Sequence, residues 1–173
     1  MFQKIENLWF FTSTINSWQK ILNKENCQII IESFNFITIN KWIKIYGFVL
    51  MPNHIHIVLS LEKKNKIAFQ RDFLKHTAQQ ILFNLKKENN AEMLLKLTST
   101  QNDRNFQIWE RRPKWILIEN ELILRQKLEY IHNNPIQEHW KLSKFNDEYF
   151  FSSAKFYKNG IQDFKFLNRY GEI

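Results

Sequence analysis

A chain of 173 residues is long enough for one domain with its own hydrophobic core and too short for two ordinary domains. Lysine and arginine number 25 against 17 aspartates and glutamates, and the net charge of +8 suits either a polyanionic partner or solubility alone. A single cysteine excludes an internal disulfide, and neither a signal peptide nor a run of about 18 apolar residues is visible, so we expect a cytoplasmic protein without a membrane span.

The first 40 residues predict a strand followed by helical segments. Residues 8–15 (LWFFTSTI) are rich in β-branched and aromatic side chains, which favour strands. Ser17 can cap a helical turn that begins over residues 18–22. The dense apolar residues of 27–39 are typical of a helix that is buried along much of its surface.

The next stretch contains two histidines in one strand. Residues 41–51 predict a second strand, and Pro52 and Asn53 form a turn signal that leads directly into a third, so the two strands form a hairpin. Because side chains alternate along a strand, His54 and His56 face the same side, about 7 Å apart. Such a pair can bind one metal ion together with a third ligand, or it can be two partly buried histidines satisfied by hydrogen bonds.

The middle of the chain predicts one long helix between two polar segments. The charged stretch 63–66 indicates a loop, and the apolar spacing of residues 67–87 indicates an amphipathic helix. Residues 88–105 are rich in Asn, Thr and Ser and predict a loop.

A strand and a helix follow. Residues 107–118 predict a strand at the sheet edge, because Pro113 cannot donate to a ladder. Residues 119–133 predict a helix that ends near Asn134, because the residue before Pro135 should avoid the helical conformation.

The order of elements predicts an α+β fold. Strand, helix, strand, strand, helix, strand, helix is the split βαβ plan of a ferredoxin-like antiparallel sheet with an appended C-terminal helix. The apolar face of the histidine strand would pack on the first two helices and leave the histidines to the last one. We expect one domain over residues 1–173, with a core at about 8–135 and a C-terminal extension at 136–173.

The last helix presents two neighbouring rows of side chains. The docking stripe consists of Leu124, Leu128 and Ile131. Lys127, Tyr130 and Asn134 form the adjacent ridge. The amide of Asn134 could complete a metal site with the histidine pair, and the phenol of Tyr130 could reach the substrate of that metal. Alternatively, the tyrosine lies at a helix–sheet border and the asparagine is a helix cap.

Several stretches, taken in order and spacing, resemble the HUH-type single-tyrosine transposases, and within them the REP-associated tyrosine transposases. They are FFTSTI at 10–15, YGFVLMPNHIHIVLSL at 46–61, FLKHTAQQI at 73–81, IWERRPKWI at 108–116, YIHNNP at 130–135 and FSSAKFY at 151–157.

The resemblance implies a ferredoxin-like nuclease domain that cuts and rejoins single-stranded DNA beside short hairpins, as a monomer or homodimer. It implies that His54 and His56 are the metal-binding HUH pair and that Tyr130 is the nucleophile. Asn134 would be the third ligand, as in REP-associated members; other insertion-sequence members have glutamine there. The cofactor would be Mg²⁺ or Mn²⁺, and the intermediate a 5′-phosphotyrosine beside a free 3′-hydroxyl. A Walker A glycine loop is absent, so no nucleotide cofactor is expected.

Basic side chains are candidates for contact with the DNA backbone, although each could equally be solvated surface charge. The candidates are Arg111, Arg112 and Lys114 on the edge strand, Lys63 and Lys64 after the histidine strand, and Lys127 before the tyrosine. Other residues are expected to be structural or surface histidines and core tryptophans, namely His76, His132, His139, Trp109, Trp115 and Trp140.

Two other functions fit the sequence. One is a domesticated, non-catalytic protein that binds hairpin or single-stranded DNA, and the presence of both histidines, the tyrosine and the asparagine argues against it. The other is a dimeric structural or regulatory protein whose aromatic surface binds a partner, which a strong salt dependence of DNA binding would oppose.

Overall fold

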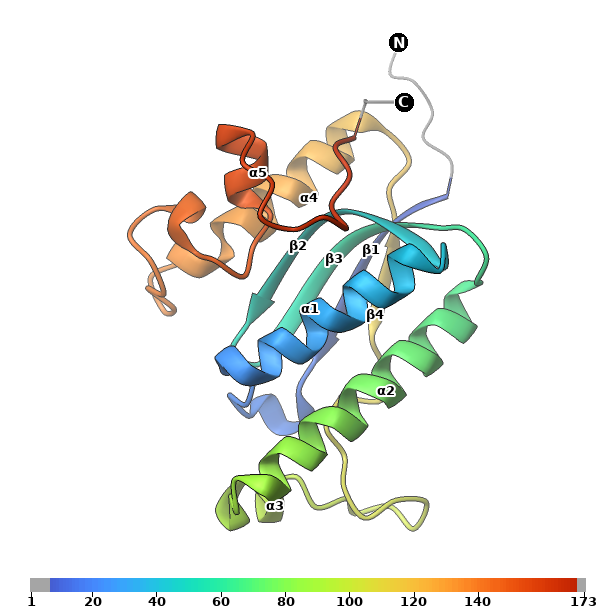
Figure 1. Ribbon diagram of the computed structural model, residues 1–173, viewed down its shortest axis with the longest axis vertical. Helices are drawn as coiled ribbons and strands as arrows, with labels where there is room; N and C mark the ends of the chain where they lie inside the picture. The colour runs from blue at the N-terminus through green and yellow to red at the C-terminus, as the bar shows by residue number, and fades with distance from the viewer. Residues whose placement is uncertain (1–6, 171–173) are drawn as a thin grey trace.

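The computed structural model describes residues 7–170 and contains a four-stranded antiparallel sheet with helices on both faces (Figure 1). The strands are β1 (Leu8–Thr14), β2 (Ile43–Met51), β3 (His54–Leu61) and β4 (Lys114–Leu117). The α-helices are α1 (Lys24–Ile39), α2 (Lys66–Lys87), α3 (Ala91–Lys96), α4 (Glu121–Asn133) and α5 (Ala154–Asn159). Three short 3₁₀ turns are η1 (Asn16–Trp18), η2 (Asn134–Ile136) and η3 (Asn146–Glu148). No helix within residues 7–170 is long and apolar enough to cross a membrane.

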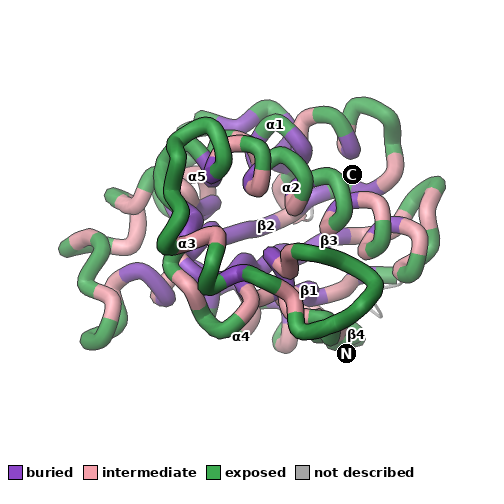
Figure 2. The backbone as a smooth tube through the Cα atoms, turned by 90° about the horizontal axis from the view of Figure 1, so that it is seen from below, coloured by how far each residue is buried: buried purple, intermediate pink, exposed green. Residues whose placement is uncertain are grey.

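The strand order β2-β3-β1-β4 confirms the predicted split βαβ plan, and every neighbouring pair is antiparallel. β4 lies at the edge, as Pro113 predicts. In the register of the central pair, Thr12 lies opposite His56 and Thr14 lies opposite His54. Burial is concentrated along β1, β2 and β3, whereas β4 is largely exposed (Figure 2).

The sheet separates two apolar clusters, because side chains alternate along each strand. On one face, Ile55 and Ile57 of β3 pack with residues of α1 and α2. On the other face, Val58 packs with the stripe of α4, which consists of Leu124, Leu128 and Ile131. Each buried Leu or Ile of that stripe contributes about 1.5–3 kcal/mol relative to exposure. The prediction that the histidine face is left to the last helix is therefore confirmed.

The close approach of α4 to the sheet depends on Gly47. This residue lies at an irregularity in the pairing of β2 with β3. A Cβ atom at this position would overlap Leu128 Cδ2 and lie 3.3 Å from Ile131 Cδ1. A side chain here would thus push against the helix that carries Tyr130.

The chain after α4 packs against β2. Leu50 N donates to Phe151 O at 2.9 Å, and Ser153 N donates to Phe48 O at 3.0 Å, so this segment runs beside the strand. Phe164 and Phe166 enter the core on the side of α1. The outer edge of β2 is therefore covered by the chain's own C-terminal segment.

The expected helical turn over residues 18–22 is wrong. Ser17 and Trp18 adopt left-handed backbone conformations, with φ of 53° and 57°, and α1 begins only at Lys24. Asn23 caps α1 by accepting a hydrogen bond from Asn26 N at 2.9 Å. The Ser17 N–H instead donates to the carboxylate of Glu110 at 2.9 Å, so a tertiary contact overrides the local helix signal.

Three smaller expectations also fail. The predicted loop 88–105 contains α3, whose cap Asn90 accepts from Met93 N at 3.1 Å. Of the predicted strand 107–118, only β4 is a strand, and its earlier part contributes a single bridge between Trp109 and Ile15. The α4 helix ends at Asn133 as expected, but Asn134 keeps helical angles (φ −56°, ψ −46°) and continues into η2.

Candidate functional site

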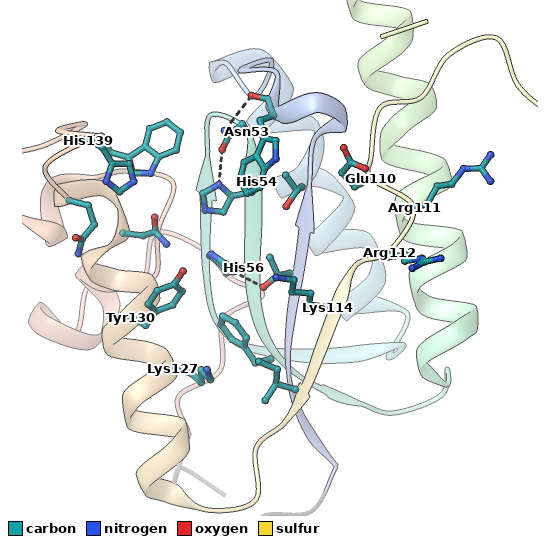
Figure 3. Close-up of a pocket in the computed structure, with 18 of the residues that line it drawn as sticks. Asn53, His54, His56, Glu110, Arg111, Arg112, Lys114, Lys127, Tyr130 and His139 are labelled. Carbon is teal, nitrogen blue, oxygen red and sulfur yellow. Dashed lines mark hydrogen bonds between the residues drawn. The ribbon is translucent and has the colours of Figure 1, made fainter. Parts of the chain in front are cut away.

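An open hollow of about 1250 Å³ lies on the α4 side of the sheet (Figure 3). The structure brings together there most of the residues that the sequence singled out, namely His54, His56, Arg111, Arg112, Lys114, Lys127, Tyr130 and Asn134. Lys63 and Lys64 do not line it. They follow β3 at the end opposite His54, where Lys64 pairs with Asp72 and lies 3.6 Å from the centre of the Trp42 ring.

The two histidines are buried side by side on β3. Their exposed fractions are 8% for His54 and 5% for His56, and their ring centroids are 4.8 Å apart. Burial, with a smaller contribution from His139, lowers the pKa of His54 to about 4. Burial, with smaller contributions from His54 and Lys127, lowers the pKa of His56 to about 3. Both imidazoles are therefore neutral near pH 7.

Hydrogen bonds determine which ring nitrogens of the two histidines could bind a ligand. The His54 Nδ1 atom lies 2.7 Å from Asn53 Oδ1, and because an amide oxygen can only accept, Nδ1 carries the proton and Nε2 keeps its lone pair. His56 Nδ1 lies 2.7 Å from Thr12 Oγ1. The Nε2 atom of His56 is buried without a hydrogen-bond partner among the described residues.

An unpartnered buried nitrogen is costly unless something binds it, so this site fits a cation. Asn134, which is 6% exposed, lines the same hollow and carries an amide oxygen. Within residues 7–170 no cluster of three or more His, Cys, Asp or Glu side chains could hold a metal ion. The donor set that could hold one here is two neutral imidazoles and one amide, which is a set for a divalent cation of hard or borderline character.

Tyr130 projects from α4 toward the histidines. Its ring centroid is 5.3 Å from that of His56 and 6.2 Å from that of Phe10, with an edge-on approach in both cases. The side chain is 54% exposed, because the buried stripe of α4 leaves this face of the helix open to the hollow. Lys127, one turn earlier, places its Nζ atom 5.0 Å from the centre of the Phe10 ring. A phenol and an ammonium group thus stand beside the histidine pair (Figure 3).

The rim of the hollow opposite α4 is basic, and an ion pair and a hydrogen bond connect it to other parts of the chain. Arg111 Nη2 pairs with Asp103 Oδ1 at 3.0 Å, while Arg112 and Lys114 line the hollow beside it. Glu110 is the acidic residue of this rim, and it accepts the hydrogen bond from Ser17 N. The rim therefore presents a surplus of positive charge.

Sequence reasoning missed several residues of the hollow. Trp140, expected in the core, is only partly buried and lies 6.0 Å from His54 between ring centroids. His139, expected to be structural or on the surface, is exposed and also lines the hollow. Trp18 and Thr12 carry no local signal for a place in the site, and Asn53 signals only a turn. Only the pairing register of β1 with β3 would have placed Thr12 beside His56. His132 and Trp109 are buried and His76 is exposed, as expected. Trp115, also expected in the core, is partly buried and packs against it.

No protein-family model matches the sequence, and no curated protein matches it. Among solved structures, the fold resembles that of a tyrosine transposase. A REP-associated tyrosine transposase bound to a REP hairpin has a TM-score of 0.63 with this chain, at 18% identity over 98% of this chain and 94% of that one. A protein from Deinococcus radiodurans R1, provisionally described as a transposase, has a TM-score of 0.49 at 14% identity over 77% and 92% of the two chains. The α+β fold predicted from the sequence is therefore shared with a solved REP-associated tyrosine transposase.

Proposed function

We propose that the protein is a REP-associated tyrosine transposase that cuts and rejoins single-stranded DNA beside hairpins. The observation that carries this proposal is the arrangement of Tyr130 and His56, whose rings lie 5.3 Å apart in an open basic hollow. The fold shared with a hairpin-bound transposase supports the same reading.

His54, His56 and Asn134 would hold a divalent ion, Mg²⁺ or Mn²⁺. The low pKa values of the two histidines keep both rings neutral, so that each ring has one unprotonated nitrogen, which metal binding requires. When bound, such an ion supplies Lewis-acid polarisation of a phosphate. Asn53 and Thr12 hold the Nδ1 side of the rings, so that each Nε2 is directed away from these partners.

Tyr130 is the proposed nucleophile. Its Oη atom forms a bond to the phosphorus of a phosphodiester while the bond from phosphorus to the 3′-oxygen breaks, which gives a 5′-phosphotyrosine. The phenol loses one proton and the leaving 3′-oxygen gains one. Because the tyrosine ester replaces the broken ester, a 3′-hydroxyl of another strand can reverse the step. The reaction is therefore strand transfer rather than hydrolysis.

The basic side chains of the hollow are the proposed contacts to the DNA backbone. Arg111, Arg112, Lys114 and Lys127 line the hollow that contains the tyrosine and the histidine pair. Neutralising phosphates in this way releases counterions and makes binding depend on salt. Lys63 and Lys64 remain a separate proposed contact at the far end of β3.

The domain boundaries and the cellular location of the protein belong to the same proposal. Residues 151–153 and 164–167 pack on β2 and the core, which supports one domain over the whole chain. A DNA transposase acts where the DNA is, in agreement with the cytoplasmic location expected from composition.

The test is covalent capture of DNA. Labelled single-stranded DNA with hairpins from the flanks of the gene is incubated with Mg²⁺ or Mn²⁺ and analysed on a denaturing gel. We expect a metal-dependent adduct with the wild type and with Tyr46→Phe, a matched control whose hydroxyl lies outside the hollow, and none with Tyr130→Phe or His56→Ala. Hairpin binding without any adduct or nick, for every flank and metal, would show a non-catalytic DNA-binding protein instead.

A further inference from the structure

The rim of the hollow next to His54 carries an exposed tryptophan on an unusual backbone. Trp18 lines the hollow and is 66% exposed, so it contributes little to the core. Both Ser17 and Trp18 adopt left-handed conformations, which cost energy for residues other than glycine. A solvent-facing indole held in this way needs a reason beyond packing.

Three hydrogen bonds hold this rim. Ser17 N donates to Glu110 Oε1 at 2.9 Å, and Trp18 N donates to Ile15 O at 2.9 Å. Asn53 Nδ2 donates to Trp18 O at 3.3 Å, while Oδ1 of the same amide accepts from His54. A single side chain therefore connects the backbone of the tryptophan to one histidine of the site.

A second indole and a cation lie nearby. Trp140 is 6.0 Å from His54, and Lys20, two residues after Trp18, places its Nζ atom 5.2 Å from the centre of the Trp140 ring. The histidine pair is thus flanked by flat aromatic surfaces in a hollow that is also lined by arginines and lysines. Aromatic faces with basic residues suit a ligand that has both a planar ring and an anionic backbone.

We propose that Trp18 is a stacking platform for an unpaired nucleobase of the DNA strand that passes the histidine pair. This inference rests on the proposed function and adds a base-binding residue to it. An unpaired base exposes the face that stacking requires, whereas the bases of a duplex already stack on one another. The basic rim formed by Arg111, Arg112 and Lys114 then binds the phosphates on either side of the stacked base.

The test is a double-mutant cycle in which Trp18 is substituted in the protein and single bases are removed from the DNA probe. Affinity is measured for single-stranded DNA that carries the hairpin from the gene's flank, and for a series of the same strands with one abasic nucleotide at each unpaired position. Trp18→Ala should weaken binding to the intact strand about 10-fold, the equivalent of about 1.4 kcal/mol. Trp18→Phe, which keeps a ring, should recover most of that loss.

Removing the base at one position should weaken DNA binding by the wild type about as much as Trp18→Ala weakens binding to the intact strand. On that abasic strand, Trp18→Ala should bind as well as the wild type does. Phe83→Ala is the matched control, because Phe83 is 67% exposed on α2 and lies outside the hollow; it should bind like the wild type. Melting curves verify that all variants are folded.

Three outcomes would overturn the inference. The first is normal binding by Trp18→Ala, the second is equal losses for Trp18→Ala on intact and on every abasic strand, and the third is a recovery with Trp18→Leu as complete as with Trp18→Phe. Adduct formation is recorded on the same samples, so that the two proposals are judged separately. If the wild type forms no adduct, the proposed function fails whatever the cycle shows; if it forms one but Trp18→Ala binds normally, only the stacking inference fails.

Discussion

Replacing Thr12 with valine tests how the site orients His56. The change removes the hydroxyl that lies 2.7 Å from His56 Nδ1 and keeps a branched side chain on β1. Both ring nitrogens would then be buried without a partner, since Nε2 already lacks one among the described residues. An unsatisfied buried group costs about 1–3 kcal/mol, and each kcal/mol lowers the melting temperature by about 2–4 °C in a chain of this size.

The same change should weaken metal binding. Losing the partner that orients a histidine ligand costs about 10- to 100-fold in affinity. Mn²⁺ binding is measured by titration calorimetry, and stability by thermal melting of the metal-free protein. Thr14→Val is the matched control, because Thr14 lines the same hollow from β1 but is not hydrogen-bonded to either histidine. If Thr12→Val binds Mn²⁺ and melts like the control, Thr12 does not orient the ring and the reasoning is wrong.

Three further predictions concern packing, pH and charge. Gly47→Ala should destabilise the fold by about 1–3 kcal/mol, because the added methyl group overlaps Leu128. The double variant Gly47→Ala/Leu128→Ala should lose less stability than the sum of the losses of the two single variants. Additive losses in melting experiments would contradict this. Burial lowers the pKa of His132 to about 4, as it lowers those of the two site histidines. The unfolded chain therefore binds more protons below its histidine pKa of about 6.5, so the melting temperature should fall from pH 7 to 5.5, and less so in His132→Gln; a flat profile would refute the burial argument. Lys127→Ala should weaken binding of single-stranded DNA and reduce the slope of log affinity against log salt concentration by about 0.7. Lys75 is exposed on α2, so Lys75→Ala should leave this slope unchanged. Equal slopes for the two variants would exclude Lys127 as a phosphate contact.

The sequence predicts those parts of the fold that depend on periodicity. Alternation along β3 places both histidines on one face, and the helical spacing of α4 places Lys127, Tyr130 and Asn134 beside its buried stripe. These patterns are local, and each of them agrees with the antiparallel sheet that forms.

The sequence does not predict features that depend on contacts between distant residues. The rim at Ser17 looks like a helix start, but its N–H bonds to Glu110, which is 93 residues away. Trp140 looks like a core residue by type, yet the chain after α4 places it at the edge of the hollow. Thr12 is an ordinary strand residue until the register sets it opposite His56.

The most direct measurement is to locate the DNA-linked residue by mass spectrometry. After reaction with the hairpin strand, nuclease treatment leaves a nucleotide on the protein, and trypsin releases residues 128–141, a peptide whose only tyrosine is Tyr130. We expect the nucleotide mass on this peptide, with fragmentation assigning it to Tyr130. A nucleotide on any other residue, such as Tyr149 or Tyr157, would contradict the assignment of the nucleophile.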